Sequence, residues 1–198
     1  MGAIFQSLGR TIVAGLVVLV VILIIAGLGT GSWVPVGEHA WWAFFFRWLH
    51  VLSGVMWIGL LWYFNFVQTP SMPQIPDEQK PAVSKVIAPR ALFWFRWGAM
   101  STIVTGLILA AMMGYIGQAL SLQKGYHAIG TGMWLGAIMW FNVWFIIWPN
   151  QKKALGIVQV SPEEKAAAAK KAGMTSRINT MLSIPMLFCM VAQQNGGF

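Results

Sequence analysis

The sequence predicts an all-α integral membrane protein, because it is 58% hydrophobic and only 9% charged, whereas a soluble domain carries roughly 25% charged residues. A helix needs about 20 apolar residues to cross the hydrocarbon of a bilayer. Five apolar segments meet or approach this length, at residues 10–28, 41–67, 91–115, 126–148 and 178–193. We therefore expect five transmembrane helices, in which an N-terminal anchor helix precedes a four-helix bundle.

The positions of lysine and arginine predict the orientation, since these residues concentrate in cytoplasmic loops. Three of them lie in the 68–90 connection and six in the 149–177 connection, whereas the 116–125 connection holds only Lys124 and the 29–40 connection holds none. We expect a cytoplasmic N-terminus and a periplasmic C-terminus in a bacterial inner membrane. The net charge of +8 then reflects topology and contact with membrane lipid, and not binding of nucleic acid.

An internal repeat follows the anchor helix. A shift of 77 residues aligns segment 47–66 with segment 124–143, and six of the twenty positions are identical in the pattern basic-x-x-His-x5-Met-Trp-x-Gly-x4-Phe-Asn. We interpret residues 41–116 and 117–198 as two copies of a helix pair. Both copies have the same orientation, so a pseudo-twofold axis along the membrane normal relates them. Residues 1–40 form the anchor helix and its outer connection.

Each copy places a histidine inside an apolar segment, at His50 and His127. An ionisable residue within a span is a functional hypothesis, because its burial costs free energy. Trp57 and Trp134 follow their histidines by seven residues, so each returns to nearly the same helix face. Two imidazoles at matched depth on symmetric helices favour axial ligation of one haem b, and helix bundles hold such cofactors between facing helices.

The neighbouring residues complete the predicted haem site. Small residues next to each histidine leave room for the macrocycle, the tryptophans pack on its edge, and a basic residue one turn nearer the outer surface neutralises a propionate. Besides the two histidines as iron ligands, the predicted cofactor-binding residues are Arg47, Ser53, Gly54, Trp57, Lys124, Gly130, Thr131 and Trp134. The competing interpretation is a pair of hydrogen-bonded packing histidines that was inherited by duplication.

Several classes of chemistry have no support in the sequence. The single cysteine, Cys189, and the absence of a C-x-x-C-H motif exclude covalent c-type haem. No nucleophile–base set, carboxylate pair, phosphate-binding loop or dinucleotide fingerprint is present, so we predict no catalytic residue. Arg96 and Arg177, near the predicted cytoplasmic ends of their helices, are expected to extend toward lipid phosphates.

The motif H-x3-G-x2-W-I-G-x3-Y-F-N-F, from His50 to Phe66, resembles the N-terminal membrane domain of bacterial membrane-bound urate oxidases, the urate hydroxylase family. Residues 83–97 resemble short members of that group, and the likeness covers roughly residues 41–190. In fuller members a cytochrome c domain follows the membrane part, and we expect a short form without it. The resemblance implies a haem-associated redox role beside a periplasmic c-type cytochrome.

The expected function is therefore a b-type haem protein that relays electrons near the periplasmic face, as a subunit of a larger membrane redox complex. Two alternatives stay open. One is a cofactor-free accessory subunit of a respiratory or photosynthetic membrane complex. The other is urate oxidation together with a separate cytochrome c.

Overall fold

The computed structural model describes residues 2–197, and the chain divides into two compact units, Met1–Phe44 and Phe45–Phe198. The described residues contain helices and no strand, which confirms the predicted all-α class. Four helical stretches are long and apolar enough to cross a membrane, namely Leu8–Thr30, His39–Gln74, Ala82–Met112 and His127–Ala154. The prediction of a membrane protein is confirmed at this level.

Unit 1 consists mainly of α2 (Leu8–Thr30), preceded by the short α1 (Gly2–Phe5). The helix α2 corresponds to the predicted anchor and ends at Gly31, whose φ of 71° is a left-handed C-cap conformation that favours glycine. Trp33 then folds back over Gly27, where a Cβ atom would lie 2.8 Å from the indole ring. Glycine at position 27 therefore allows the outer connection to fold back over the end of the helix.

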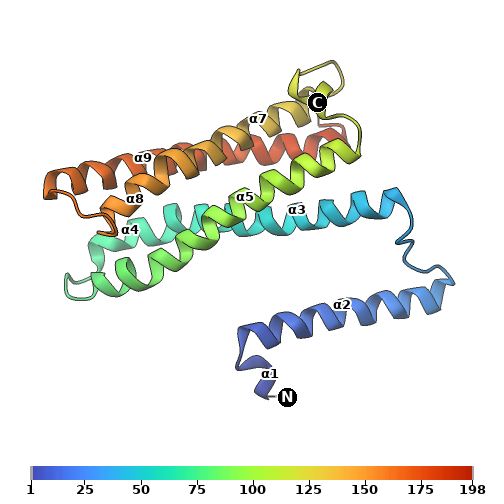
Figure 1. The fold of residues 1–198 in the computed structure, drawn as a ribbon, viewed down its shortest axis with the longest axis horizontal. Helices are drawn as coiled ribbons and strands as arrows, with labels where there is room; N and C mark the ends of the chain where they lie inside the picture. The colour runs from blue at the N-terminus through green and yellow to red at the C-terminus, as the bar shows by residue number, and fades with distance from the viewer. Residues whose placement is uncertain (1, 198) are drawn as a thin grey trace. The chain divides into compact units, whose positions relative to one another are not determined.

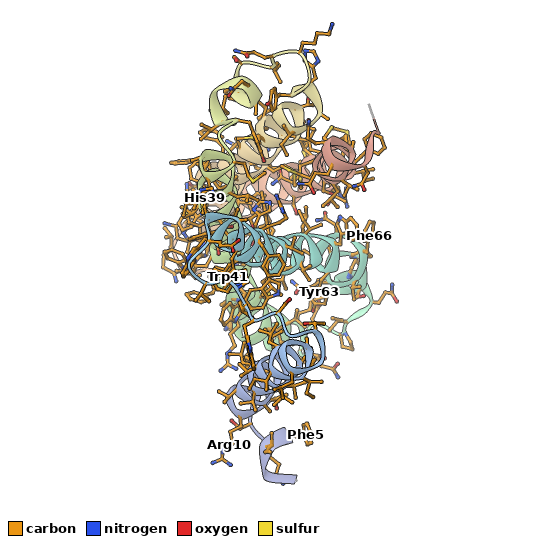
Figure 2. All side chains as sticks on the ribbon, turned by 90° about the vertical axis from the view of Figure 1, so that its right-hand side faces the viewer. Phe5, Arg10, His39, Trp41, Tyr63 and Phe66 are labelled. Carbon is orange, nitrogen blue, oxygen red and sulfur yellow. The ribbon has the colours of Figure 1, made fainter. Side chains whose placement is uncertain are left out.

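The first helix pair of unit 2 starts from α3 (His39–Trp62), whose beginning lies in unit 1. Figure 2 labels His39 and Trp41 at the start of this helix, and Tyr63 and Phe66 at the opposite end of the same stretch. The chain continues through four short helical elements into one long helix, which runs antiparallel to α3 (Figure 1). These elements are the π-helix η1 (Tyr63–Gln68), α4 (Thr69–Ser71), the 3₁₀-helix η2 (Met72–Gln74), the π-helix η3 (Ala82–Ile87) and α5 (Ala88–Met112).

The second helix pair has the same order of long helices. Its elements are α6 (Ile116–Leu120), α7 (His127–Phe141), the π-helix η4 (Asn142–Ile147), α8 (Trp148–Ala154) and α9 (Pro162–Asn195). In Figure 1, α9 runs beside α7 and α8. The N-cap of α9 is Ser161, whose hydroxyl accepts a hydrogen bond from the Glu164 backbone N–H at 3.2 Å.

The helix α9 is continuous over 34 residues, so the end of the predicted 149–177 connection and the predicted span at 178–193 lie on one helix. It is not among the helices of residues 2–197 that are apolar enough to cross a membrane. Charged residues in its first half and polar residues along its length lower its hydropathy, and on its packed face Asn179 and Ser183 are fully buried. A fifth crossing by this helix stays a prediction.

A proline explains the position of each π-helix. The segments η1, η3 and η4 end two residues before Pro70, Pro89 and Pro149, respectively. A proline inside a helix lacks the N–H and its ring clashes with the carbonyl four residues earlier. The wider i→i+5 turn moves that carbonyl away and lets the chain continue as a helix. The two long stretches that carry a predicted histidine ligand are His39–Gln74 and His127–Ala154. Each contains its own π-helix, which ends two residues before a proline.

Contacts join the four long helices of unit 2 in a ring. Trp57 of α3 packs on Gly98 of α5, and α5 contacts α7. The helices α7 and α9 pack along much of their length, and Trp62 of α3 closes the ring by donating to the Ser183 hydroxyl of α9 at 3.0 Å. No hydrogen bond of the described residues joins α3 directly to α7, and a diagonal placement of the two helices with the predicted histidines stays a prediction.

Candidate functional site

His50 lies on α3 and packs against two turns of α5. Its Nδ1 atom is 2.9 Å from the Thr102 carbonyl oxygen and 3.4 Å from the Thr105 hydroxyl. A carbonyl only accepts hydrogen bonds, so the imidazole must carry a proton on Nδ1 to form this bond. A neutral ring then keeps an unprotonated Nε2. Metal-ligating histidines commonly have this arrangement, in which one nitrogen donates to a backbone carbonyl and the other binds the metal.

The His50 ring is also fixed sterically by Gly106 of α5. A Cβ atom at this position would lie 2.8 Å from Cε1 and 3.0 Å from Nδ1 of His50. Contacts shorter than 3.0 Å are essentially never made by a real Cβ atom. Any larger residue at position 106 must therefore displace the ring, and glycine and the Thr102 carbonyl together define one orientation of the imidazole.

The other predicted site residues of the first copy lie along the same seam between α3 and α5. Arg47 approaches the Met113 sulfur with Nη2 at 3.9 Å, and the hydroxyls of Ser53 and Ser101 are 2.7 Å apart. Trp57 is 1% exposed and belongs to the hydrophobic core. This face of α3 is thus used mainly for packing on α5.

Gly54 lies on α3 one turn after His50, and the space around its Cα atom is open. A Cβ atom added to Gly54 would meet no atom of the described residues within 4 Å. A space for a flat group next to His50 stays a prediction.

The second copy has a different environment. His127 is the first residue of α7 and is exposed. The notch next to it is filled, because a Cβ atom on Gly130 would overlap the carbonyl oxygen of Ala119 in α6. Trp134 donates from Nε1 to the Leu120 carbonyl at 3.0 Å. Lys124 and Thr131 are exposed.

The structure therefore brings the predicted residues together in two separate sets. His50 lies eleven residues after the start of α3, whereas His127 begins α7, and no hydrogen bond of the described residues joins the two imidazoles. The duplicated sequence pattern is the same in both copies, but the short helix α6 directly precedes α7, whereas no helix of the described residues lies between α2 and α3. This insertion is the reason why equal sequence motifs acquire unequal surroundings.

The number of metal-binding side chains that lie together distinguishes a site for a bare metal ion from a site for haem. The described residues contain no group of three or more histidine, cysteine, aspartate or glutamate side chains that could hold a metal ion. A bare ion bound by side chains alone has no support. Haem supplies its own equatorial nitrogens and needs only one or two protein ligands. The Nε2 atom of His50 has no hydrogen-bond partner among the described residues, so this imidazole has the donor atom that one haem ligand requires, and His127 lies at the start of a different helix.

Arg96 is a residue that sequence reasoning placed incorrectly. Its guanidinium carbon lies 3.3 Å from the centre of the Trp148 ring and 6.0 Å from that of Trp144. Its Nε and Nη1 atoms are buried without a hydrogen-bond partner in the described part of the chain. The side chain thus makes cation–π contacts within unit 2, where an extension toward lipid phosphates had been expected. The i, i+4 spacing of the two tryptophans is the sequence signal that could have indicated this contact.

The fold and its composition define an all-helical protein with four stretches able to cross a membrane. Residues 118–196 match the family described as urate oxidase N-terminal, so the predicted resemblance is confirmed for this part of the chain. The match falls on the second copy, whereas the motif that indicated the family lies in the first. No curated protein and no solved structure matches the chain.

Proposed function

We propose that the protein binds one haem b and relays electrons near the periplasmic face of a bacterial inner membrane. The observation that carries this proposal is the hydrogen bond from His50 Nδ1 to the Thr102 carbonyl oxygen, because it leaves Nε2 available as an axial ligand. The bound haem supplies reversible one-electron chemistry. His127 is the proposed second ligand, and Arg47 and Lys124 are the proposed partners of the propionates.

The residues around His50 give the proposed ligand a fixed geometry. The Thr102 carbonyl holds the proton on Nδ1, and Gly106 limits rotation of the ring. Arg47 lies beside the residues that follow α5. There, burial raises the pKa of the Tyr115 phenol, and the nearby Arg47 guanidinium partly offsets this rise. The Arg47 side chain thus lies at the same end of the helices as Met113 and Tyr115.

The membrane arrangement that accompanies this proposal has five crossings and a four-helix bundle built from the repeated pair. A cytoplasmic N-terminus then places His50 and His127 toward the periplasm. A periplasmic c-type cytochrome or a larger membrane redox complex is the proposed electron partner. The ring of contacts among α3, α5, α7 and α9 supports the bundle.

The test is a dithionite-reduced minus oxidised optical spectrum of the full chain, purified in mild detergent from haem-replete cells. We expect b-type Soret and α bands and about one haem per chain by pyridine haemochrome. His50→Ala is expected to abolish these bands. His39→Ala is the matched control, because His39 lies on the same helix about 16 Å away at 1.5 Å per residue and is exposed.

The variants separate the possible ligand sets. Loss of haem in both His50→Ala and His127→Ala supports ligation by two histidines. Loss in His50→Ala alone assigns one axial position to His50 and removes His127 from the site. Full haem content in both variants would overturn the proposal.

A cofactor-free accessory subunit is the second candidate function. In this function the two repeated positions serve helix packing alone. His50 donates a hydrogen bond to the Thr102 carbonyl of α5, and Gly130 leaves room for the Ala119 carbonyl of α6. A protein that is colourless after purification and that co-purifies in a fixed ratio with an oxidase, a dehydrogenase or a photosynthetic complex would support this function. The absence of any such fixed-ratio complex would count against it.

Urate oxidation with a separate cytochrome c is the third candidate, and the family match over residues 118–196 favours it. The assay is urate-dependent reduction of added cytochrome c. Activity that disappears in His50→Ala and persists in His39→Ala would support this function. No reduction above the rate without protein would exclude it.

A further inference from the structure

An open depression of about 280 Å³ lies on one face of α9, in the part of this helix that is predicted to be cytoplasmic. All residues that line it belong to α9 and recur at the three- and four-residue spacing of a single helix face. They are Ala167, Lys170, Lys171, Met174, Thr175 and Ile178. The depression thus combines two adjacent lysines with two large apolar side chains, and it shares no residue with the proposed haem site.

The positive charge of the two lysines is not balanced by the protein. Lys170 and Lys171 are exposed, and both ion pairs of the described residues involve other lysines. Glu164 is the last acidic residue of the sequence, so the rest of α9 offers no counter-charge. The Thr175 hydroxyl already donates to the Lys171 carbonyl at 2.9 Å. The two ammonium groups are therefore the polar contacts that the depression offers, and they fit an anion.

The same face of α9 continues from the lysines as an exposed apolar stripe. Met174 is 55% exposed and Ile178 is 46% exposed. At 100° per residue, Met181 and Phe188 return to within about 20° of the direction of Lys170. The large exposed apolar residues beyond the depression are Met181, Ile184, Phe188 and Val191. A contiguous apolar surface of this kind marks contact with a partner or a membrane, and its length fits an acyl chain.

Spacing along the helix places both charges at the height of lipid headgroups. Lys171 and Lys170 precede Met174 by about 4.5 and 6 Å, at 1.5 Å per residue. The headgroup layer of one leaflet is about 5–8 Å thick, because a bilayer of about 40–45 Å contains a hydrocarbon core of about 30 Å. An acyl chain that begins beside Met174 therefore has its phosphate at the level of the two ammonium groups.

We propose that this depression binds an anionic phospholipid of the cytoplasmic leaflet, with the phosphate held by Lys170 and Lys171 and an acyl chain along Met174 and Ile178. A zwitterionic phospholipid carries its own ammonium group next to the phosphate, so it gains less from the lysines. The site is consequently expected to select an anionic headgroup. Binding here rests on the proposed membrane arrangement and does not require haem.

The experiment titrates the full chain, purified in mild detergent, with dioleoyl phosphatidylglycerol. Bound lipid is measured by native mass spectrometry, and the Kd is expressed as the mole fraction of lipid in the micelle. Dioleoyl phosphatidylcholine is the matched ligand, because it has the same acyl chains and a zwitterionic headgroup. We expect a saturable first binding step with a lower Kd for phosphatidylglycerol than for phosphatidylcholine.

Three double variants separate the site from the overall positive charge. Lys170→Gln/Lys171→Gln is expected to raise the Kd for phosphatidylglycerol about 30-fold, because each lysine near an anionic lipid surface contributes about 5-fold. Lys170→Arg/Lys171→Arg keeps both charges and is expected to bind like the parent chain. The control is Lys85→Gln/Lys165→Gln, which removes the same number of charges from exposed positions outside the depression.

Each outcome supports or overturns the proposal. Selective binding of phosphatidylglycerol that is weakened in Lys170→Gln/Lys171→Gln and retained in the control supports it. Equal Kd values for the two lipids in the parent chain would overturn it, and so would an equal loss in both glutamine variants, which would show a diffuse effect of net charge. Displacement of the lipid by an equal concentration of inorganic phosphate would assign the lysines to a free anion. His50→Ala is expected to bind the lipid normally, so a failure of the haem proposal is distinguishable from a failure of this one.

Discussion

The buried amide pair Asn142–Asn179 allows a quantitative test of how α7 and α9 are held together. Asn179 is fully buried, and its Nδ2 atom donates to the Met139 carbonyl at 2.9 Å. Its Oδ1 atom accepts from Asn142 Nδ2 at 2.8 Å. Asn179→Leu keeps a side chain of similar size but removes both hydrogen bonds. It also leaves the amide N–H group of Asn142, which is 9% exposed, without its partner on α9.

The expected loss of stability in Asn179→Leu is the sum of the two lost hydrogen bonds and the unpaired Asn142 amide. Hydrogen bonds between membrane helices average about 0.6 kcal/mol and reach about 1.7 kcal/mol, so the two bonds together stabilise the protein by about 1–2 kcal/mol. A buried donor that loses its partner costs a further 1–3 kcal/mol, approximately. We therefore expect Asn179→Leu to lower the free energy of unfolding by about 2–5 kcal/mol. In Asn142→Ala/Asn179→Leu the orphaned amide is removed, and the cost should be smaller than the sum of the single variants.

The assay is reversible unfolding in mixed micelles titrated with sodium dodecyl sulfate, followed by the fluorescence of the 12 tryptophans. A double-mutant cycle on Asn142 and Asn179 should give a coupling energy of about 1 kcal/mol. The control cycle pairs Asn179 with Asn195, which is exposed and bonds only within α9 to the Val191 carbonyl. Distant sites add within about 0.3–0.5 kcal/mol. A coupling between Asn142 and Asn179 no larger than that of the control would refute the reasoning.

Three further predictions use the same unfolding assay. Gly173→Ala should raise the free energy of unfolding by about 0.5–1 kcal/mol, because alanine is favoured in a helix interior and the added methyl group meets open space. Arg96→Met should lower it by about 2 kcal/mol, since it removes the cation–π contact with Trp148. Gly106→Ala should lower it by about 1–3 kcal/mol, because the new Cβ atom displaces the His50 ring. The same variant should reduce haem content if His50 is the ligand, although the imidazole itself is still present.

Matched variants check these three expectations. Arg177→Met is the control for Arg96, because Arg177 is its repeat counterpart at a shift of 81 residues and is exposed. Gly59→Ala is the control for both glycine positions, as a helical glycine with open space around it. A destabilisation by Arg177→Met as large as that by Arg96→Met would show that the loss of charge, and not the contact with Trp148, is responsible. Stability of Gly106→Ala equal to that of Gly59→Ala would contradict the tight packing at His50.

Local features of the sequence were sufficient to predict much of the fold. The apolar segments at 10–28, 41–67, 91–115 and 126–148 all fall on helices able to cross a membrane, because hydropathy and length act within one segment and need no knowledge of its neighbours. The cap at Ser161 is also a local feature, since the hydroxyl and the N–H from which it accepts a hydrogen bond are three residues apart. The family resemblance also came from a contiguous motif.

The boundary predicted between the 149–177 connection and a span at 178–193 was wrong, because α9 is continuous from Pro162 to Asn195. The predicted span contains the polar residues Asn179 and Ser183. In the structure they are packing residues, since Asn179 bonds to α7 and Ser183 accepts from Trp62 of α3. A sequence pattern does not distinguish a polar residue that faces water from one that faces a partner helix.

The sequence by itself therefore determined that this is an all-helical membrane protein with a repeated histidine motif, because those properties depend on local composition and spacing. Only the tertiary structure decided what each histidine contacts. Register between helices places His50 against Gly106 and Thr102, and the inserted α6 fills the equivalent notch beside His127. Contacts of this kind depend on how two distant segments slide and rotate against each other, and a shift of one helical turn would exchange every partner.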